Sequence, residues 1–234
     1  MRLAILSDIH ANLEALKAAL AEVDRRGVDA IVCLGDIVGY GPDPAPCVDL
    51  VRQRCAAVVL GNHDEAVAFD RNLRYLPKDG ETAARLHQTL LSEDQLAWLR
   101  TLPLRVRSGS TVTLAHAAPL NPSEWPRLDN YGLLKAQFEA FDTDVCFVGH
   151  SHRPAVVAES VGVHRVRKGH RYLIDVGSVG QPRDNDPRLS FGLFDTEAFE
   201  FEHVRAHYDL AKTSARIREV GLPAEIASRL QRGI

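Results

Sequence analysis

The sequence predicts an α/β protein with two packed β-sheets, because strand and helix patterns alternate at its start and strand patterns dominate its later part. At the start, strands are expected over residues 2–6, 30–34 and 57–60, with a helix that Gly27 ends and a helix over about 46–54 between them. This βαβαβ order predicts parallel strands joined by right-handed crossovers. The strands that follow later in the chain are expected to form a second sheet.

The middle of the chain, residues 64–102, is expected to be a helical insertion, since Ser92-Glu93-Asp94-Gln95 forms a capping-box pattern. Another helix is expected over residues 131–141. Further strands are expected over residues 104–107, 111–115, 145–148, 155–161, 163–166, 172–176, 190–194 and 200–204. A helical tail over about 209–232 ends the chain. Because no linker or internal repeat interrupts the pattern, we expect a single domain over residues 1–234.

The composition is that of an ordinary globular protein, with 234 residues, 45% hydrophobic and 25% charged. A net charge of −3 gives no basic field that would concentrate nucleic acid, so we expect no strong nucleic-acid patch. No apolar run is long enough for a signal peptide or a membrane span, and we expect a cytoplasmic protein that does not enter membranes. The cysteines lack CxxC spacing and are expected to be reduced and structural.

Polar side chains with metal-binding atoms follow five of the expected strands. They are Asp8, His10, Asp36, Asn62, His63, His116, His150 and His152. Because the ends of parallel strands meet at one sheet edge, these groups are expected to converge there. Carboxylates, an amide oxygen and imidazoles together suit divalent Mn, Fe, Co, Ni or Zn. The set is too large for one ion and suits two ions that share a bridging carboxylate.

Each short motif alone has a structural alternative. The segment Gly61-Asn62-His63-Asp64 could simply cap a helix, and a single histidine at a strand end is more often structural than metal-binding. The segment Gly149-His150-Ser151-His152 is more specific, since alternate histidines after a strand are unusual without a metal. The order and placement of all five blocks favour the metal site.

The five blocks resemble the calcineurin-like metallophosphoesterase superfamily, whose blocks read D-x-H, G-D, G-N-H-[DE], H and G-H-x-H. The resemblance covers the chain to about Arg183 and implies two mixed β-sheets packed as a sandwich, with helices on both outer faces. It implies one metal ion on Asp8, His10, Asp36 and His152, and a second on Asp36, Asn62, His116 and His150. It further implies that His63 is not a ligand but contacts phosphate and protonates the leaving oxygen.

One branch of that superfamily differs from this sequence. Phosphoprotein phosphatases read G-D-x-V-D-R-G in the second block, where an Asp orients the catalytic histidine and an Arg binds phosphate. Gly39 and Tyr40 stand at those positions here, so protein phosphatase activity is disfavoured. Asp64 and a backbone carbonyl remain as candidate partners for His63. The sequence looks more like the small bacterial phosphodiesterases and the relatives of the diadenosine tetraphosphatases.

Three residues outside the blocks are candidates for substrate binding. Arg183 could supply positive charge to the phosphate or form a surface salt bridge, and these alternatives are evenly balanced. Asn12 could contact the substrate, although capping of the first helix is the simpler interpretation. Trp125 could stack on a nucleobase, but packing of its proline-rich loop is more common. The histidines outside the blocks, His87 among them, are expected to be structural or at the surface.

These observations favour a metal-dependent hydrolase of phosphate esters that contains two divalent ions. A phosphodiester or nucleotide substrate is preferred slightly over a small phosphomonoester. A binding or scaffold protein without catalysis, like the retromer subunit that resembles this superfamily, is the alternative from another class. A scaffold that has lost activity usually lacks ligands or the catalytic histidine, and here the full set is present. The amphipathic tail leaves a homo-oligomer open.

Overall fold

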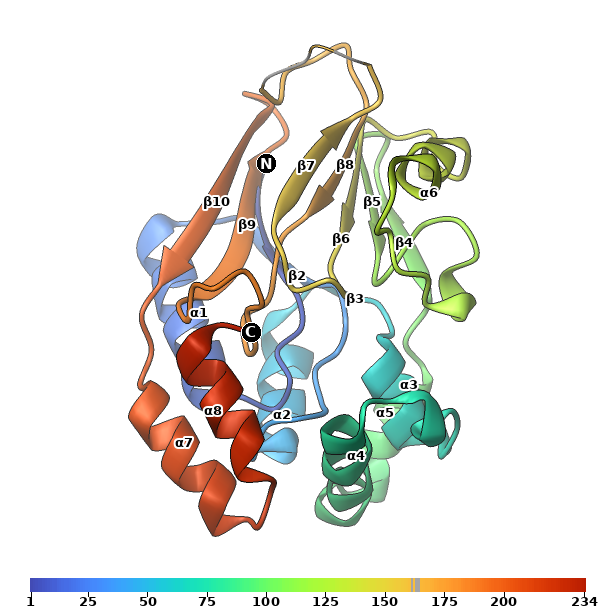
Figure 1. The fold of residues 1–234 in the computed structure, drawn as a ribbon. Helices are drawn as coiled ribbons and strands as arrows, with labels where there is room; N and C mark the ends of the chain where they lie inside the picture. The colour runs from blue at the N-terminus through green and yellow to red at the C-terminus, as the bar shows by residue number, and fades with distance from the viewer. Residues whose placement is uncertain (161, 163–164) are drawn as a thin grey trace.

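Two five-stranded sheets lie face to face in the computed structural model, which describes residues 1–160, 162 and 165–234 (Figure 1). The strands are β1 (Arg2–Leu6), β2 (Ala30–Cys33), β3 (Ala57–Val58), β4 (Arg105–Ser108), β5 (Val112–Ala115), β6 (Val145–Val148), β7 (Ala155–Ala158), β8 (Tyr172–Asp175), β9 (Leu189–Asp195) and β10 (Glu200–Ala206). Their order is β10-β9-β1-β2-β3 in one sheet and β4-β5-β6-β8-β7 in the other.

Both sheets are mixed, as the resemblance implied. Strands β1, β2 and β3 are parallel, which confirms the predicted βαβαβ unit, whereas β9 runs antiparallel to both β1 and β10. In the second sheet β5, β6 and β8 are parallel, and β4 and β7 are antiparallel at its edges. The parallel strands of each sheet therefore deliver the segments that follow them to one edge.

The helices include an insertion after β3 and a C-terminal hairpin. They are α1 (Leu13–Arg26), α2 (Pro44–Arg54), α3 (Asn62–Phe69), α4 (Lys78–Leu90), α5 (Glu93–Arg100), α6 (Tyr131–Ala136), α7 (Leu210–Glu219) and α8 (Ala224–Arg232), with 3₁₀ turns η1 (Leu73–Tyr75), η2 (Pro122–Glu124) and η3 (Gln137–Glu139). The helical insertion is α3 to α5, and the predicted capping box of Ser92 and Gln95 begins α5. The C-terminal tail is the hairpin of α7 and α8, which pack on each other. Within the described residues, no helix is both long and apolar enough to cross a membrane.

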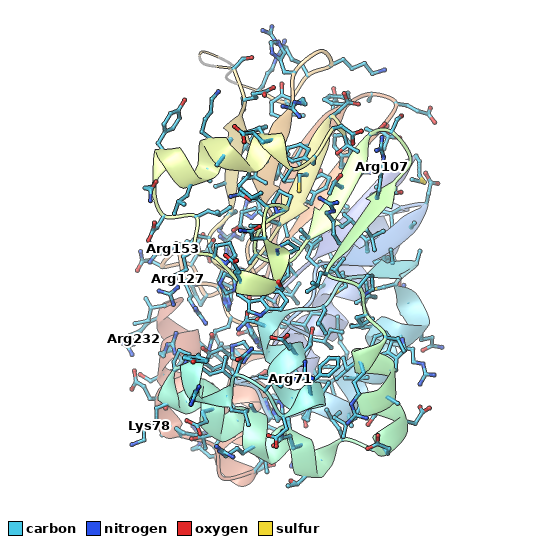
Figure 2. The ribbon with its side chains drawn as sticks, turned by 90° about the vertical axis from the view of Figure 1, so that its right-hand side faces the viewer. Arg71, Lys78, Arg107, Arg127, Arg153 and Arg232 are labelled. Atoms are coloured by element: carbon cyan, nitrogen blue, oxygen red, sulfur yellow. The ribbon has the colours of Figure 1, made fainter. Side chains whose placement is uncertain are left out.

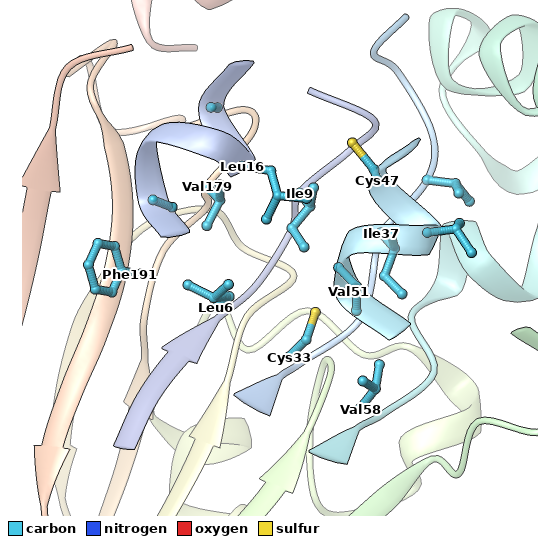
Figure 3. Packing of buried hydrophobic residues seen from close by; sticks show 14 of the residues in the cluster. Leu6, Ile9, Leu16, Cys33, Ile37, Cys47, Val51, Val58, Val179 and Phe191 are labelled. Atoms are coloured by element: carbon cyan, nitrogen blue, oxygen red, sulfur yellow. The ribbon is translucent and has the colours of Figure 1, made fainter. Parts of the chain in front are cut away.

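The alternation of side chains along β1 separates two cores. Leu3 and Ile5 pack between the sheets, with Phe147 from the opposite sheet. Leu6 lies on the other face, among side chains of α1 and α2 (Figure 3). The outer face of the second sheet packs against Phe138 in η3. Helical segments therefore cover both outer faces, as expected for the sandwich.

Several expected boundaries differ from the structure. Strand β3 ends at Val58 because the Leu60 amide bonds to the Pro103 carbonyl instead of a sheet neighbour. The helix expected over 131–141 divides into α6 and η3. The strand expected over 155–161 ends at Ala158, and residue 161 is not described. Of the strand expected over 163–166, residues 163 and 164 lie outside the described residues.

Candidate metal centre

The ends of the parallel strands carry a strained backbone. Five candidate ligands have left-handed φ angles, which cost free energy for residues other than glycine: Asp8 (51°), His10 (48°), Asp36 (51°), His150 (65°) and His152 (60°). Backbone hydrogen bonds from Asp8 N to Gly35 O and from His10 N to Asp36 O connect the two loops that follow β1 and β2. The fold therefore holds these side chains in one place at a conformational cost.

One set of donor atoms surrounds Asp8. Its Oδ1 lies 3.3 Å from Nε2 of His152 and 3.8 Å from Nε2 of His10. Nε2 of His10 lies 3.1 Å from that of His152 and 3.6 Å from Oδ2 of Asp36. These are the four residues that the resemblance assigned to one metal ion.

The other set shares Asp36. Its Oδ2 lies 3.4 Å from Nε2 of His116. Oδ1 of Asn62 lies 3.1 Å from the same His116 nitrogen and 3.0 Å from Nδ1 of His150. Asp36 therefore lies between the two sets, in the position that a bridging carboxylate requires.

Backbone carbonyls determine which histidine nitrogens face inward. A carbonyl can only accept a hydrogen bond, so each Nδ1 that contacts one must carry the proton. Such contacts join His10 to Val38 at 3.0 Å, His116 to Leu34 at 2.8 Å, and His152 to Gln181 at 2.5 Å. In the neutral rings of His10 and His152, Nε2 therefore presents a lone pair to the carboxylates. Nε2 of His116 would do so when a metal ion replaces its proton, and such carbonyl-oriented rings are typical of histidine ligands.

These donor sets fit divalent cations. Asp8 and His116 are fully buried, and Asp8 Oδ1 has no hydrogen-bond partner among the described residues. The second oxygen of Asp8 accepts from Ser7 Oγ at 2.6 Å and from the His150 amide at 3.0 Å, which orients the carboxylate. Lone pairs that face one another at 3.1 to 3.8 Å repel unless a proton or a metal ion lies between them.

The pKa values reflect this concentration of buried charge. Burial lowers the pKa of His10 and His152 well below the usual range and that of His150 to about 3, so these rings are neutral. Burial favours a neutral Asp36, but the charges of His116 and His63 outweigh burial and hold its pKa well below the usual value. Burial likewise opposes a charge on His116, and the carboxylate of Asp36 overcomes it, raising the His116 pKa to about 10. Without a metal, a proton on His116 thus balances part of the negative charge of the Asp8 and Asp36 carboxylates.

His63 lies beside the donor sets and is 4% exposed. Its amide donates to Oδ1 of Asp36 at 2.8 Å, and a ring nitrogen lies within 4.8 Å of ligand atoms of His10 and Asp36. Its Nδ1 has no hydrogen-bond partner among the described residues. Neither of the two candidate partners, Asp64 or a backbone carbonyl, therefore orients the ring in the described part of the chain.

Asp64 has another role in the structure. Its carboxylate accepts hydrogen bonds from the amides of Ile37 at 2.9 Å, Val38 at 3.1 Å and Gly61 at 3.2 Å. These bonds join the start of α3 to the loop after β2. Asp64 therefore fixes the relative position of Asp36 and His63 through the backbone.

His87 is a supporting residue whose position the sequence did not indicate. It is fully buried in α4, where Nδ1 accepts from the Gly39 amide at 3.0 Å and Nε2 donates to the Gly41 carbonyl at 2.8 Å. The structural alternative for this histidine is therefore confirmed. No motif spacing marks it, because its partners lie more than 40 residues earlier in the chain.

A pocket of about 940 Å³ opens onto Asp36, Asn62 and His63. Figure 2 shows Arg127 and Arg153 at the same side of the molecule, and both line this pocket. Its lining also includes Tyr75, Trp125, Leu128 and Arg183. The candidate donor atoms are therefore accessible to a ligand that has anionic and apolar parts.

The three candidate substrate contacts differ in their surroundings. Arg183 lines the pocket and donates to Gln181 Oε1 at 2.6 Å, and within the described residues it has no salt bridge to a carboxylate. Trp125 also lines the pocket, but its Nε1 donates to Glu65 at 2.9 Å, which supports the packing role. Asn12 caps α1 and donates to the Gly180 carbonyl at 2.9 Å. Its substrate contact stays a prediction that these bonds do not support.

Comparisons with known proteins agree with this geometry. A model of the calcineurin-like phosphoesterase superfamily domain matches residues 1–198. The crystal structure of a metallophosphoesterase from Sphaerobacter thermophilus is 38% identical, covers 100% of this chain and 99% of its own, and superposes with a TM-score of 0.88. An uncharacterized protein of Methanocaldococcus jannaschii is 38% identical over 97% of this chain and 96% of its own. Phosphodiesterase YfcE of Escherichia coli is 26% identical over 84% of this chain and 89% of its own. The chain therefore belongs to the calcineurin-like phosphoesterase superfamily.

Proposed function

We propose that the protein is a phosphodiesterase that depends on a dinuclear metal centre. The observation that carries this proposal is the pair of buried donor sets that share Asp36 and face one pocket. Asp8, His10, Asp36 and His152 would hold one ion, and Asp36, Asn62, His116 and His150 the other. The mixed nitrogen and oxygen ligands accept Mn, Fe, Zn, Ni or Co.

When bound, the two ions lower the pKa of water and neutralise charge on the phosphoryl oxygens. The protein's own residues prepare the site for this chemistry. Backbone carbonyls orient His10, His116 and His152 so that Nε2 of each ring faces the carboxylates. His63 supplies a proton to the leaving oxygen as a general acid, a role that commonly contributes about 10² to 10⁴ in rate.

Arg183 is proposed to bind a non-transferred phosphoryl oxygen. Its guanidinium is partly buried next to the pocket, and this burial lowers its pKa, so an anionic partner would be favourable there. A charged hydrogen bond to phosphate would offset the cost of burying this cation. Asn12 is less suited to this role, since its polar atoms bond within the protein.

A diester is preferred over a monoester because the pocket extends well beyond the donor sets. Its wall continues past Arg127 and Arg153 to the apolar side chains of Leu128 and Val157. A second ester arm would occupy this space, whereas a small phosphomonoester would leave it empty. The phosphodiesterase name of the Escherichia coli relative supports the same class.

The test uses metal-stripped protein refilled with Mn, and compares hydrolysis of bis-p-nitrophenyl phosphate with that of p-nitrophenyl phosphate. Metal-dependent turnover of the diester, lost in Asp36→Asn and His63→Ala, is the expected result. His63→Ala should retain its metal content. Preference for the monoester would replace the diesterase proposal by a phosphomonoesterase, and no turnover of either ester or of a nucleotide panel by metal-loaded protein would favour the scaffold alternative.

A further inference from the structure

Tyr40 occupies an unusual place beside the proposed catalytic histidine. It is 3% exposed, its φ is 56°, and it follows Gly39, whose φ is 91°. A bulky residue in the left-handed region costs free energy and is usually kept for a purpose. The centroid of the Tyr40 ring lies 4.7 Å from that of His63 and 4.9 Å from that of His10.

Packing, rather than a hydrogen bond to Nδ1, holds the ring of His63 in the described part of the protein. Gly39 contributes no side chain, and Nδ1 of His63 lacks a hydrogen-bond partner among the described residues. A Cβ on Gly80 would lie 3.1 Å from Cε1 of His63 and 3.3 Å from the ring of Tyr40. Tyr40 and the two glycines therefore form a close-fitting enclosure around the imidazole.

Two guanidinium groups lie over the ring of Tyr40. That of Arg183 is 5.4 Å from the ring centroid and that of Arg229 is 5.8 Å from it, both within cation–π range. Arg183 comes from the loop after β8, and Arg229 comes from α8. The Tyr40 ring thus contacts both Arg183, the proposed phosphate-binding residue, and Arg229 of the C-terminal helix.

Helix α8 is itself fixed against this loop. Ile226 and Leu230 belong to the same buried cluster as Tyr40. The Gly233 carbonyl accepts from the Asn185 amide at 2.8 Å, two residues after Arg183. This helix lies beyond residue 198, outside the part of the chain that the superfamily domain matches.

We propose that Tyr40, supported by Arg229 of the C-terminal helix, is a positioning residue that fixes the His63 ring and the Arg183 guanidinium in the pocket. Its effect on turnover rests on the proposed phosphodiesterase function, but its effect on the position of the ring does not. The tail after residue 209 is therefore part of the site's support.

The matched variants are Arg229→Gln and Arg232→Gln. Both change one arginine of α8, but Arg232 is exposed, pairs with Glu225 and lies at the outer side of the molecule (Figure 2). A third variant, Tyr40→Leu, removes the ring. Thermal unfolding of each variant establishes that it is folded.

The first measurement is the Cε1–H resonance of His63 in the metal-free protein, assigned by its loss in His63→Gln. We expect it to move in Arg229→Gln, which keeps the Tyr40 ring, and to stay in place in Arg232→Gln; in Tyr40→Leu the loss of the ring current alone shifts it, because the two ring centroids are 4.7 Å apart. In Mn-loaded protein, kcat for the diester should fall by about 10- to 100-fold in Tyr40→Leu and less in Arg229→Gln, since small misplacements of catalytic groups are costly.

A His63 resonance in Arg229→Gln that matches that in Arg232→Gln would overturn the inference. So would a kcat in Tyr40→Leu and Arg229→Gln equal to that of Arg232→Gln. If the wild-type protein fails to hydrolyse diesters, the proposed function fails, while the resonance still decides whether Tyr40 positions the ring.

Discussion

A Cβ atom on Gly39 would overlap Nδ1 of His63, so these two residues share a space that admits no further side chain. We predict that Gly39→Ala lowers kcat by about 10²-fold or more, because the imidazole must move. Metal content should remain, since Gly39 is not a ligand. Turnover and bound metal measured on one preparation test this.

Gly109→Ala is the matched control for that substitution. Gly109 has a φ of 63°, also in the left-handed region, but a Cβ there meets nothing within 4 Å. Both alanines should lose about 1 kcal/mol of stability through backbone strain, and Gly39→Ala should lose more because its Cβ overlaps His63. Only Gly39→Ala should lose activity. Equal activity in the two variants would show that the space beside His63 is not required.

His87 makes the stability depend on pH. Burial lowers its pKa to about 4. The ring is therefore neutral near pH 7, and its Nδ1 accepts a hydrogen bond from the Gly39 amide. The ordinary pKa is 6.5, so the unfolded chain binds more protons between these two values. The contribution of His87 to the free energy of unfolding is therefore complete above pH 6.5 and is lost as the pH falls towards 4. This loss is on the order of 3 kcal/mol at most.

Urea unfolding of metal-free protein at about pH 7.5 and about pH 5 measures this contribution. The loss of stability on acidification should be smaller in His87→Gln than in wild type. His207→Gln, which changes an exposed histidine, should behave like wild type. An identical pH dependence in His87→Gln and wild type would exclude His87 as the source.

Asp36→Asn should abolish stabilisation by metal. A saturating metal at 100 times its Kd stabilises a folded protein by about 2.7 kcal/mol. Wild-type protein should gain at least this amount when Mn is added, whereas Asp36→Asn should gain little, because both donor sets lose their shared carboxylate. Unfolding curves with and without Mn measure the gain. Asp94→Asn, at an exposed carboxylate, should keep it, and an undiminished gain in Asp36→Asn would argue against a shared ligand.

Arg183→Gln should raise KM for the diester by roughly 10-fold, the loss of one charged hydrogen bond of about 1.4 kcal/mol. Arg188→Gln is the control, since Arg188 pairs with Asp186 and does not line the pocket. Initial rates over a range of substrate concentrations separate KM from kcat. A KM unchanged in both variants would remove Arg183 from the substrate contacts.

The strand ends were predictable because an apolar strand followed at once by small and polar residues, Ser7 before Asp8 and a glycine before Asp36 and His150, is a local pattern. Asp8, Asp36 and His150 were placed from such patterns, and the structure brings them together. The residues that hold the segment around His63 in place were not predictable from the sequence. His87 and Arg229 reach Gly39 and Tyr40 from helices far along the chain, through packing that no spacing in the sequence indicates.

The most direct test of the account is the anomalous scattering of Mn in crystals of the metal-loaded protein. We predict two peaks per chain, roughly 3.5 to 4 Å apart, with Asp36 between them. One should lie among Asp8, His10 and His152, and the other among Asn62, His116 and His150. A single peak, or peaks away from these donor sets, would contradict the dinuclear centre.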